Sequence, residues 1–117
     1  MLQITPKHKI HIAVQPVNFR KGIDGLKAIC QQQLNLDPFS GNLFVFCNSR
    51  QTAVKILIYD SNGFWLCHKR FSQSKLKWWP NNALQASKIR AIELIIILQQ
   101  GLPFDAKILD AWRQLED

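Results

Sequence analysis

The chain has 117 residues, a hydrophobic share of 47%, four Trp and seven Phe. This length suits one domain with one hydrophobic core, and this composition excludes an intrinsically disordered chain. Fifteen Lys and Arg against eight Asp and Glu give a formal net charge of +7. Such an excess favours a polyanionic partner, most often nucleic acid; the alternative is a solvated basic surface that serves solubility.

The positive charge is concentrated in one part of the chain. From Arg50 to Arg90 there are eight basic residues and one acid, Asp60. The sign reverses from Ala91 onward, where five acids face two basic residues. An anionic ligand is therefore expected to bind the basic stretch and to avoid the C-terminal end.

The cysteines and the longest apolar run indicate in which cellular compartment the protein is expected. Cys30, Cys47 and Cys67 are odd in number and widely spaced, which predicts reduced, partly buried thiols and no disulfide framework. The longest apolar run, Leu94 to Leu98, is far too short to span a membrane, and no apolar run near the N-terminus resembles a signal peptide. We expect a cytoplasmic protein.

The first predicted elements are a strand and a helix. Ile10 to Val14 alternate in polarity, as in a short strand, and Pro16 ends it because proline cannot donate to a sheet. Apolar residues then recur at three- and four-residue steps, which predicts a helix from about Ile23 to Leu34. Asn18 can cap the segment after the strand.

The middle of the chain predicts three strands. Turn formers in Asp37 to Gly41 lead into Leu43 to Cys47, whose aromatic and β-branched residues are typical of a strand buried on both faces. Ala53 to Tyr59 is the next strand. Asp60 to Gly63 contains Asn-Gly, the strongest signal for a tight hairpin turn, and Phe64 to Phe71 is the second arm.

The last third predicts a short strand and two helices. Leu76 to Trp79 can add a short strand before Pro80. Helical spacing over about Ala86 to Leu98 predicts a helix that is apolar nearly all round, so it is either central to the core or covered by a partner. Phe104 to Leu115 predicts a final amphipathic helix.

These elements predict an α+β fold in a single domain. We expect a mostly antiparallel four- to five-stranded sheet, with a helix after the first strand and one or two C-terminal helices. Residues 1–102 would form the main domain. Residues 103–117 would be a C-terminal helical extension that belongs to the same domain or binds a partner.

No set of residues predicts catalysis, a metal site or a cofactor. A two-metal site needs several converging carboxylates, whereas Asp24, Asp37 and Asp60 fall at predicted turns or a helix start, where they cap or form Asx turns. The three histidines and three cysteines form no local set with metal-ligand spacing, and no glycine-rich phosphate loop is present. We therefore expect a protein that is not an enzyme.

Basic residues interleaved with aromatic residues are the strongest functional pattern. Cations bind phosphates, and flat rings can stack on unpaired bases. The candidate nucleic-acid-binding residues are Arg20, Lys21, Arg50, Lys55, Lys69, Arg70, Lys75, Lys77 and Trp78. The alternative is that the rings belong to the core and the charges are merely solvated. Alternation sends adjacent Trp78 and Trp79 to opposite sides, so at least one of them could be exposed.

Several short segments also occur in a recognisable order. They are Asn18 to Leu26, Asp37 to Gly41, Leu43 to Phe46, Lys55 to Asp60, Phe64 to Leu66, Lys69-Arg70 and Trp79-Pro80. This series resembles the accessory protein TnpB, the second open reading frame of the insertion-sequence sixty-six family of bacterial transposons. The resemblance implies a protein encoded beside a larger transposase and required for transposition, with DNA binding commonly supposed and no known catalytic residue.

Two functions remain open. The first is a non-catalytic accessory factor whose basic surface contacts the transposon ends or the transposase-DNA complex. The second is a protein-interaction subunit that binds the transposase through the apolar helix from Ala86 to Leu98, or through the final helix, without contacting DNA.

Overall fold

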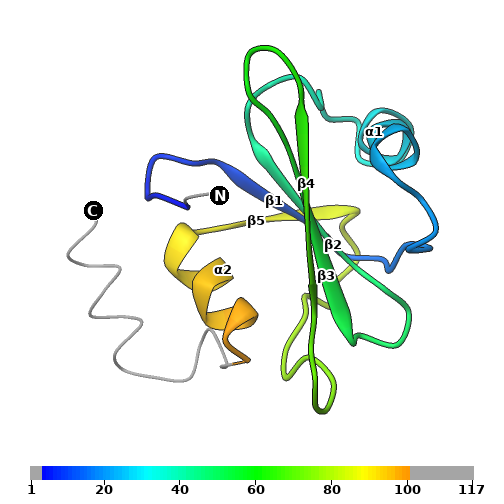
Figure 1. The fold of residues 1–117 in the computed structure, drawn as a ribbon, viewed down its shortest axis with the longest axis vertical. Helices are drawn as coiled ribbons and strands as arrows, with labels where there is room; N and C mark the ends of the chain where they lie inside the picture. The colour runs from blue at the N-terminus through cyan, green and yellow to red at the C-terminus, as the bar shows by residue number, and fades with distance from the viewer. Residues whose placement is uncertain (1–3, 101–117) are drawn as a thin grey trace.

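The computed structural model describes residues 4–100, which form one five-stranded sheet with a helix on each face (Figure 1). The strands are β1 (Ile10–Ala13), β2 (Leu43–Cys47), β3 (Ala53–Tyr59), β4 (Phe64–Arg70) and β5 (Ala86–Ile89). The helices are α1 (Ile23–Gln32) and α2 (Ala91–Leu98). The predicted α+β class is confirmed.

The strand order is β4-β3-β2-β1-β5, and only β1 and β2 are parallel. A parallel neighbour requires a crossover connection, which α1 provides between β1 and β2. The strands β2, β3 and β4 are antiparallel neighbours, with the predicted hairpin turn between β3 and β4. The last strand, β5, does not extend this series but joins the opposite edge of the sheet, beside β1.

One face of the sheet is covered by α1. Leu26, Ile29 and Cys30 fall on one stripe of this helix and are buried against a cluster that includes Phe44 and Phe46 of β2. The other face of β2 is buried as well, so every residue of this strand is inaccessible. The sequence-based expectation of a strand buried on both faces is confirmed.

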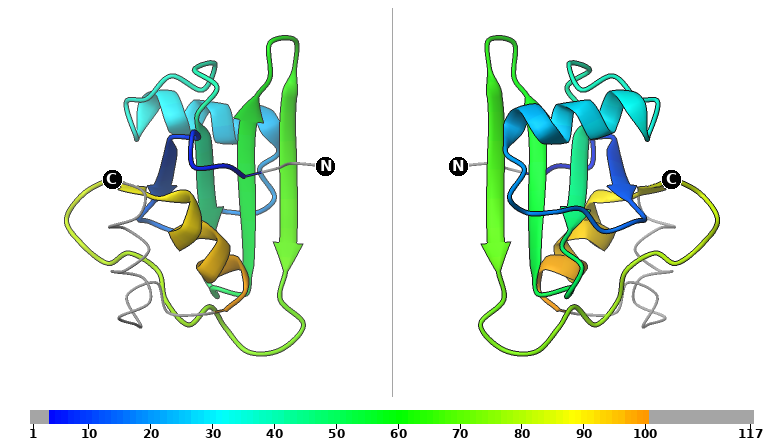
Figure 2. Two further views of the ribbon diagram at one scale, coloured as in Figure 1. Left: turned by 90° about the vertical axis from the view of Figure 1, so that its left-hand side faces the viewer. Right: turned by 90° about the vertical axis from the view of Figure 1, so that its right-hand side faces the viewer.

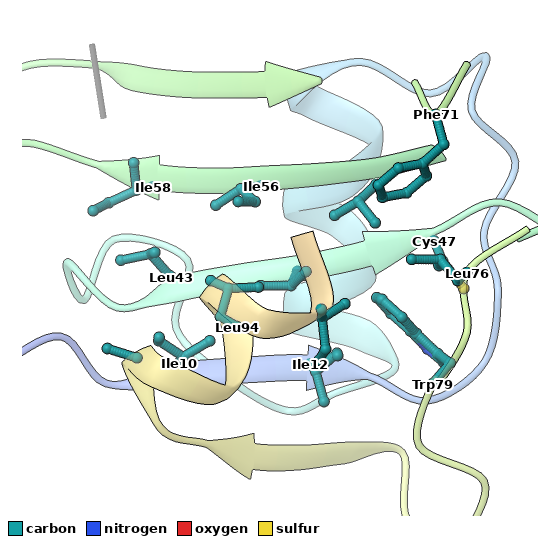
Figure 3. Packing of buried hydrophobic residues seen from close by; sticks show 14 residues of the cluster. Ile10, Ile12, Leu43, Cys47, Ile56, Ile58, Phe71, Leu76, Trp79 and Leu94 are labelled. Atoms are coloured by element: carbon teal, nitrogen blue, oxygen red, sulfur yellow. The ribbon is translucent and has the colours of Figure 1, made fainter. Parts of the chain in front are cut away.

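The opposite face is covered by α2. Ala91, Leu94 and Ile97 are the buried residues of this helix. Figure 3 shows Leu94 above the sheet, near Ile10 and Ile12 of β1. This second cluster is the larger of the two and continues to the end of the sheet where β2 finishes.

Residues 71–85, which we call the crossing loop, connect β4 at one edge to β5 at the other. The backbone N–H of Phe71 donates to the Thr52 carbonyl at 2.9 Å, and that of Leu76 donates to the Gln51 carbonyl at 2.7 Å. The buried Trp79 donates from Nε1 to the Ala13 carbonyl at 3.0 Å. Figure 3 shows Phe71, Leu76 and Trp79 gathered beside Cys47 at this end of the sheet. The loop thus closes one end of the core.

Two predicted elements in this region are wrong. The helix predicted from about Ala86 begins only at Ala91, because Ala86–Ile89 pairs with β1 as strand β5. The strand predicted for Leu76 to Trp79 is not formed; these residues belong to the crossing loop, which is held by side-chain packing and single hydrogen bonds.

Smaller differences occur near α1. The helix ends at Gln32, two residues before the predicted Leu34. Asn18 does not cap it: the Asn18 Oδ1 accepts the backbone N–H of Arg20 at 2.9 Å in a local turn, and Gly22 is the N-cap residue. The final helix predicted for residues 104–115 lies outside the described residues.

The three cysteines are free thiols, as predicted. Burial raises the pKa of Cys30 and of Cys47 to about 12, so both behave as small apolar side chains. Cys67 is half-buried on the edge strand β4. Among residues 4–100, no helix has the length and apolar character needed to cross a membrane.

His11 is a buried polar residue on the face covered by α1. Its ring stacks on Phe44, with centroids 5.5 Å apart, and its Nε2 lies 3.3 Å from the amide nitrogen of Asn42. Burial, followed by the positive charges of Lys88 and Lys9, lowers the pKa of His11 below its usual value of 6.5. The folded protein therefore favours the neutral imidazole.

A first prediction concerns pH. Because the folded pKa lies below the unfolded one, the unfolded chain binds the proton first, and stability falls as the pH drops below 6.5 until it reaches the folded pKa. His11→Phe keeps a ring against Phe44 and cannot be protonated. Urea denaturation at pH 7.5 and pH 5.5 should show a smaller loss of stability for this variant than for the wild type. Equal losses would contradict the assignment.

A second prediction concerns the crossing loop. Trp79→Phe leaves the buried Ala13 carbonyl without its donor, which should cost about 1–3 kcal/mol of unfolding free energy in urea denaturation. Trp65→Phe is the matched control, since Trp65 also donates its indole N–H, to Asp60, but is 55% exposed. It should change stability by less than about 0.5 kcal/mol.

Candidate nucleic-acid interface

Three segments bring basic residues to the end of the sheet where β1 and β2 finish. They are the connection from β1 to α1, the turn from β2 to β3, and the last residues of β4 with the crossing loop. In the register, Ala53 of β3 pairs with Arg70 of β4, so the turn and the crossing loop leave the sheet side by side. Figure 2 shows the turn from β2 to β3 and the crossing loop at the lower end of the sheet. We call this region the basic end; its exposed cations are Arg20, Lys21, Arg50, Lys69, Arg70, Lys75 and Lys77.

Arg20 and Arg50 line one hollow of about 730 Å³, the β1–β2 hollow. Its two walls are joined by a hydrogen bond of 2.9 Å from the Val17 N–H to the Cys47 carbonyl. The turn that carries Arg50 is held by Asn48, whose side chain bonds both the hydroxyl and the backbone N–H of Thr52 at 2.8 Å. Arg20 and Arg50, which are distant in sequence, therefore line the same hollow, and hydrogen bonds hold the segments that carry them.

Lys69, Arg70 and Lys77 line a second hollow of about 430 Å³, the β4 hollow, together with the last residues of α2. Lys69 donates from Nζ to the carbonyl of Leu98 at 2.5 Å. A cation is favourable there because the carbonyls at a helix C-terminus carry partial negative charge. Lys69 thus stabilises α2 while it contributes charge to this hollow.

Within residues 4–100, no ion pair neutralises the charge of the basic end. No carboxylate in residues 4–100 lies within 4.0 Å of any of its seven cations, and the ion pair of Lys27 with Asp24 belongs to α1. Guanidinium groups bind phosphate oxygens in pairs of parallel hydrogen bonds, and lysines bind them as point charges. The arrangement suits a polyphosphate backbone that passes along the end of the sheet.

Lys55 departs from the prediction that it contacts phosphate. Only 7% of this residue is exposed, and its ammonium group donates to the carbonyls of Phe19 at 2.9 Å and Lys21 at 3.0 Å. It also lies 4.9 Å from the centre of the Phe19 ring. Lys55 points from β3 toward the face covered by α1, where it holds the connection that carries Arg20 and Lys21.

The tryptophans of the crossing loop belong to the core. Trp79 is 8% exposed, and Trp78 is half-buried and packed against the same cluster. Of the large hydrophobic side chains exposed within the described part of the chain, Phe39 and Trp65 lie near the β3–β4 hairpin, and Leu84 lies in the crossing loop but is not aromatic. The packing alternative is therefore observed for Trp79, whereas contact of the half-buried Trp78 with nucleic acid stays a prediction.

A second group of basic residues, not predicted from the sequence, lies at the other end of β1 and consists of His8, Lys9, Lys88 and Arg90. Lys88 and Arg90 belong to the basic stretch from Arg50 to Arg90, but only the pairing of β5 with β1 brings them to Lys9.

No group of three or more His, Cys, Asp or Glu side chains that could hold a metal ion occurs in residues 4–100.

Two proteins of Sinorhizobium fredii are similar to this chain. Protein y4jC is 35% identical over 72 residues, which cover 62% of each chain. Protein y4hO is 31% identical over 70 residues, which cover 60% of this chain and 61% of the relative. The chain thus matches less than two thirds of either relative's length. No solved structure matches it.

A family model extends the comparison over most of the chain. The model of the family described as IS66 Orf2 like protein matches residues 8–107, which include all five strands, both helices and the whole basic end. The segments that suggested TnpB lie within this range. The chain therefore belongs to the IS66 Orf2-like family, the accessory TnpB proteins of IS66 insertion sequences.

Proposed function

We propose that this protein is a non-catalytic accessory factor in transposition that binds DNA of its element, alone or with the transposase, through the basic end. The observation that carries this proposal is the convergence of seven exposed cations from three separate segments, with no carboxylate in residues 4–100 close enough to pair with them. Bringing like charges together costs free energy, which an anionic partner would offset.

The partner that fits best is the phosphate backbone of duplex DNA. Binding to single strands usually combines cations with aromatic side chains on which bases stack. At the basic end the aromatic residues Phe71 and Trp79 are buried, and Trp78 is half-buried. Seven cations beside one half-buried ring favour contacts to phosphates, which position a protein on DNA without reading its sequence.

The alternative function, binding to the transposase through α2, has less support. Three residues of α2 are already buried against the sheet, and Ile92, Ile95 and Ile96 are half-buried. The side chains that α2 could offer to a partner are therefore half-buried and not fully exposed. Co-purification with the transposase from a nuclease-treated lysate would nevertheless support that function, whereas loss of the complex on nuclease treatment would support bridging by DNA.

Binding to a duplex from the transposon end should weaken steeply with salt, since each phosphate contact adds about 0.9 to the slope of log K against log salt. Arg50→Gln with Arg70→Gln should lower that slope by about 2, measured by fluorescence anisotropy over a KCl series. Lys7→Gln with Lys27→Gln is the matched control, because it removes two positive charges away from the basic end. It should leave the slope nearly unchanged.

Two results would contradict DNA binding by the basic end. One is the absence of any anisotropy change for the wild type at low salt. The other is an equal salt slope for the wild type and the variant that lacks Arg50 and Arg70.

Lys55 provides a separate prediction, because it acts as a positioning residue for the basic end. Lys55→Met leaves the carbonyls of Phe19 and Lys21 without their donor, which should destabilise the fold by about 1–3 kcal/mol. At a temperature where the variant stays folded, its affinity for the duplex should fall because Arg20 is less well placed. Lys7→Met is the control for loss of one lysine and should change neither quantity appreciably.

A merely structural role for Lys55 would give a different result. Circular dichroism would then show the loss of stability, while the affinity of the folded fraction would equal that of the wild type.

A further inference from the structure

A third basic hollow lies at the start of β1, at the opposite end of this strand from the β1–β2 hollow. It has a volume of about 420 Å³, and we call it the β1–β5 hollow. Its basic lining residues are His8 and Lys9 before β1, and Lys88 and Arg90 at the end of β5. None of these residues belongs to the basic end.

The sheet register brings these basic residues together. Ile10 pairs with Ile89 and His11 pairs with Lys88, so the residues that flank the two strands meet although about 80 positions separate them in sequence. Lys9 is also fixed at its backbone, since its carbonyl accepts the N–H of Leu43 at 2.9 Å. The ends of two paired strands therefore hold the hollow in place.

Lys9 and Lys88 supply the positive charge on which this site depends. Lys9 and Lys88 are exposed, and no carboxylate of the described residues lies within 4.0 Å of either ammonium group. Glu93 is the acid closest in sequence, and it accepts the backbone N–H of Arg90 at 3.1 Å. Lys9 and Lys88 are also the charges that disfavour protonation of the neighbouring His11. The hollow is therefore positively charged through Lys9 and Lys88, with Glu93 as the neighbouring acid in sequence.

We propose that the β1–β5 hollow is a second site for the phosphate backbone of duplex DNA, so that one molecule holds two DNA segments at opposite ends of β1. This inference rests on the proposed function for the first segment, which the basic end would bind. A protein with two such sites can join two duplexes without forming a dimer. Lys9 and Lys88 are the residues that would bind the second segment.

A bridging assay tests the proposal. A short biotinylated duplex is fixed on streptavidin beads, monomeric protein is added, and capture of a second, fluorescent duplex is measured, with light scattering as the check on oligomeric state. The wild type should capture the second duplex. Lys9→Glu with Lys88→Glu should reduce capture about tenfold while anisotropy still reports binding of a single duplex. Lys7→Glu, an exposed neighbour that does not line the hollow, should keep most of the capture.

The outcomes separate the two proposals. Binding of one duplex without capture of another, or capture that is unchanged in the Lys9 and Lys88 variant, would overturn the second site and leave the basic end intact. A third outcome is that the affinity for a single duplex falls in both the Arg50/Arg70 and the Lys9/Lys88 variants, and that no second duplex is captured. Both groups of cations would then bind the same duplex, which would also overturn bridging. Failure to bind any duplex would overturn the proposed function itself.

Discussion

The position of β5 is the constraint on which the rest of the structure depends. Because β4 and β5 occupy opposite edges of the sheet, residues 71–85 must cross the whole end of it. The crossing is held by Trp79 on the carbonyl of Ala13 and by two backbone hydrogen bonds to the turn after β2. One loop therefore closes the core and carries Lys75 and Lys77 to the end where Arg20 and Arg50 lie.

Local pattern predicted the central part of this fold well. Leu43 to Cys47 is apolar without a break, as a central strand between two helices should be. Asn62-Gly63 lies in the turn between β3 and β4, whose residues pair in register. Ala86–Ile89 could not be recognised in the same way. Its apolar residues fit helical spacing equally well, and its pairing with β1 depends on residues about 80 positions earlier.

The site was predictable in its charge but not in its geometry. Composition singled out the cations of the basic end, since unpaired charges need no particular neighbour to remain exposed. The burial of Lys55 could not be predicted from the sequence, because its two carbonyl partners lie 36 and 34 residues away. Only the position of these carbonyls in the fold shows that this lysine is internal. Lys9 and Lys88 likewise carry little meaning until β1 and β5 are paired.

The strand order also has a consequence for how the chain folds during synthesis. β1 is synthesised before the other four strands, and its outer edge stays unpaired until residues 86–89 emerge. Contacts of such long sequence separation slow folding and leave a bare strand edge exposed to other chains in the meantime. The nascent protein thus completes its sheet only after β5, the last of the five strands in sequence, has been made.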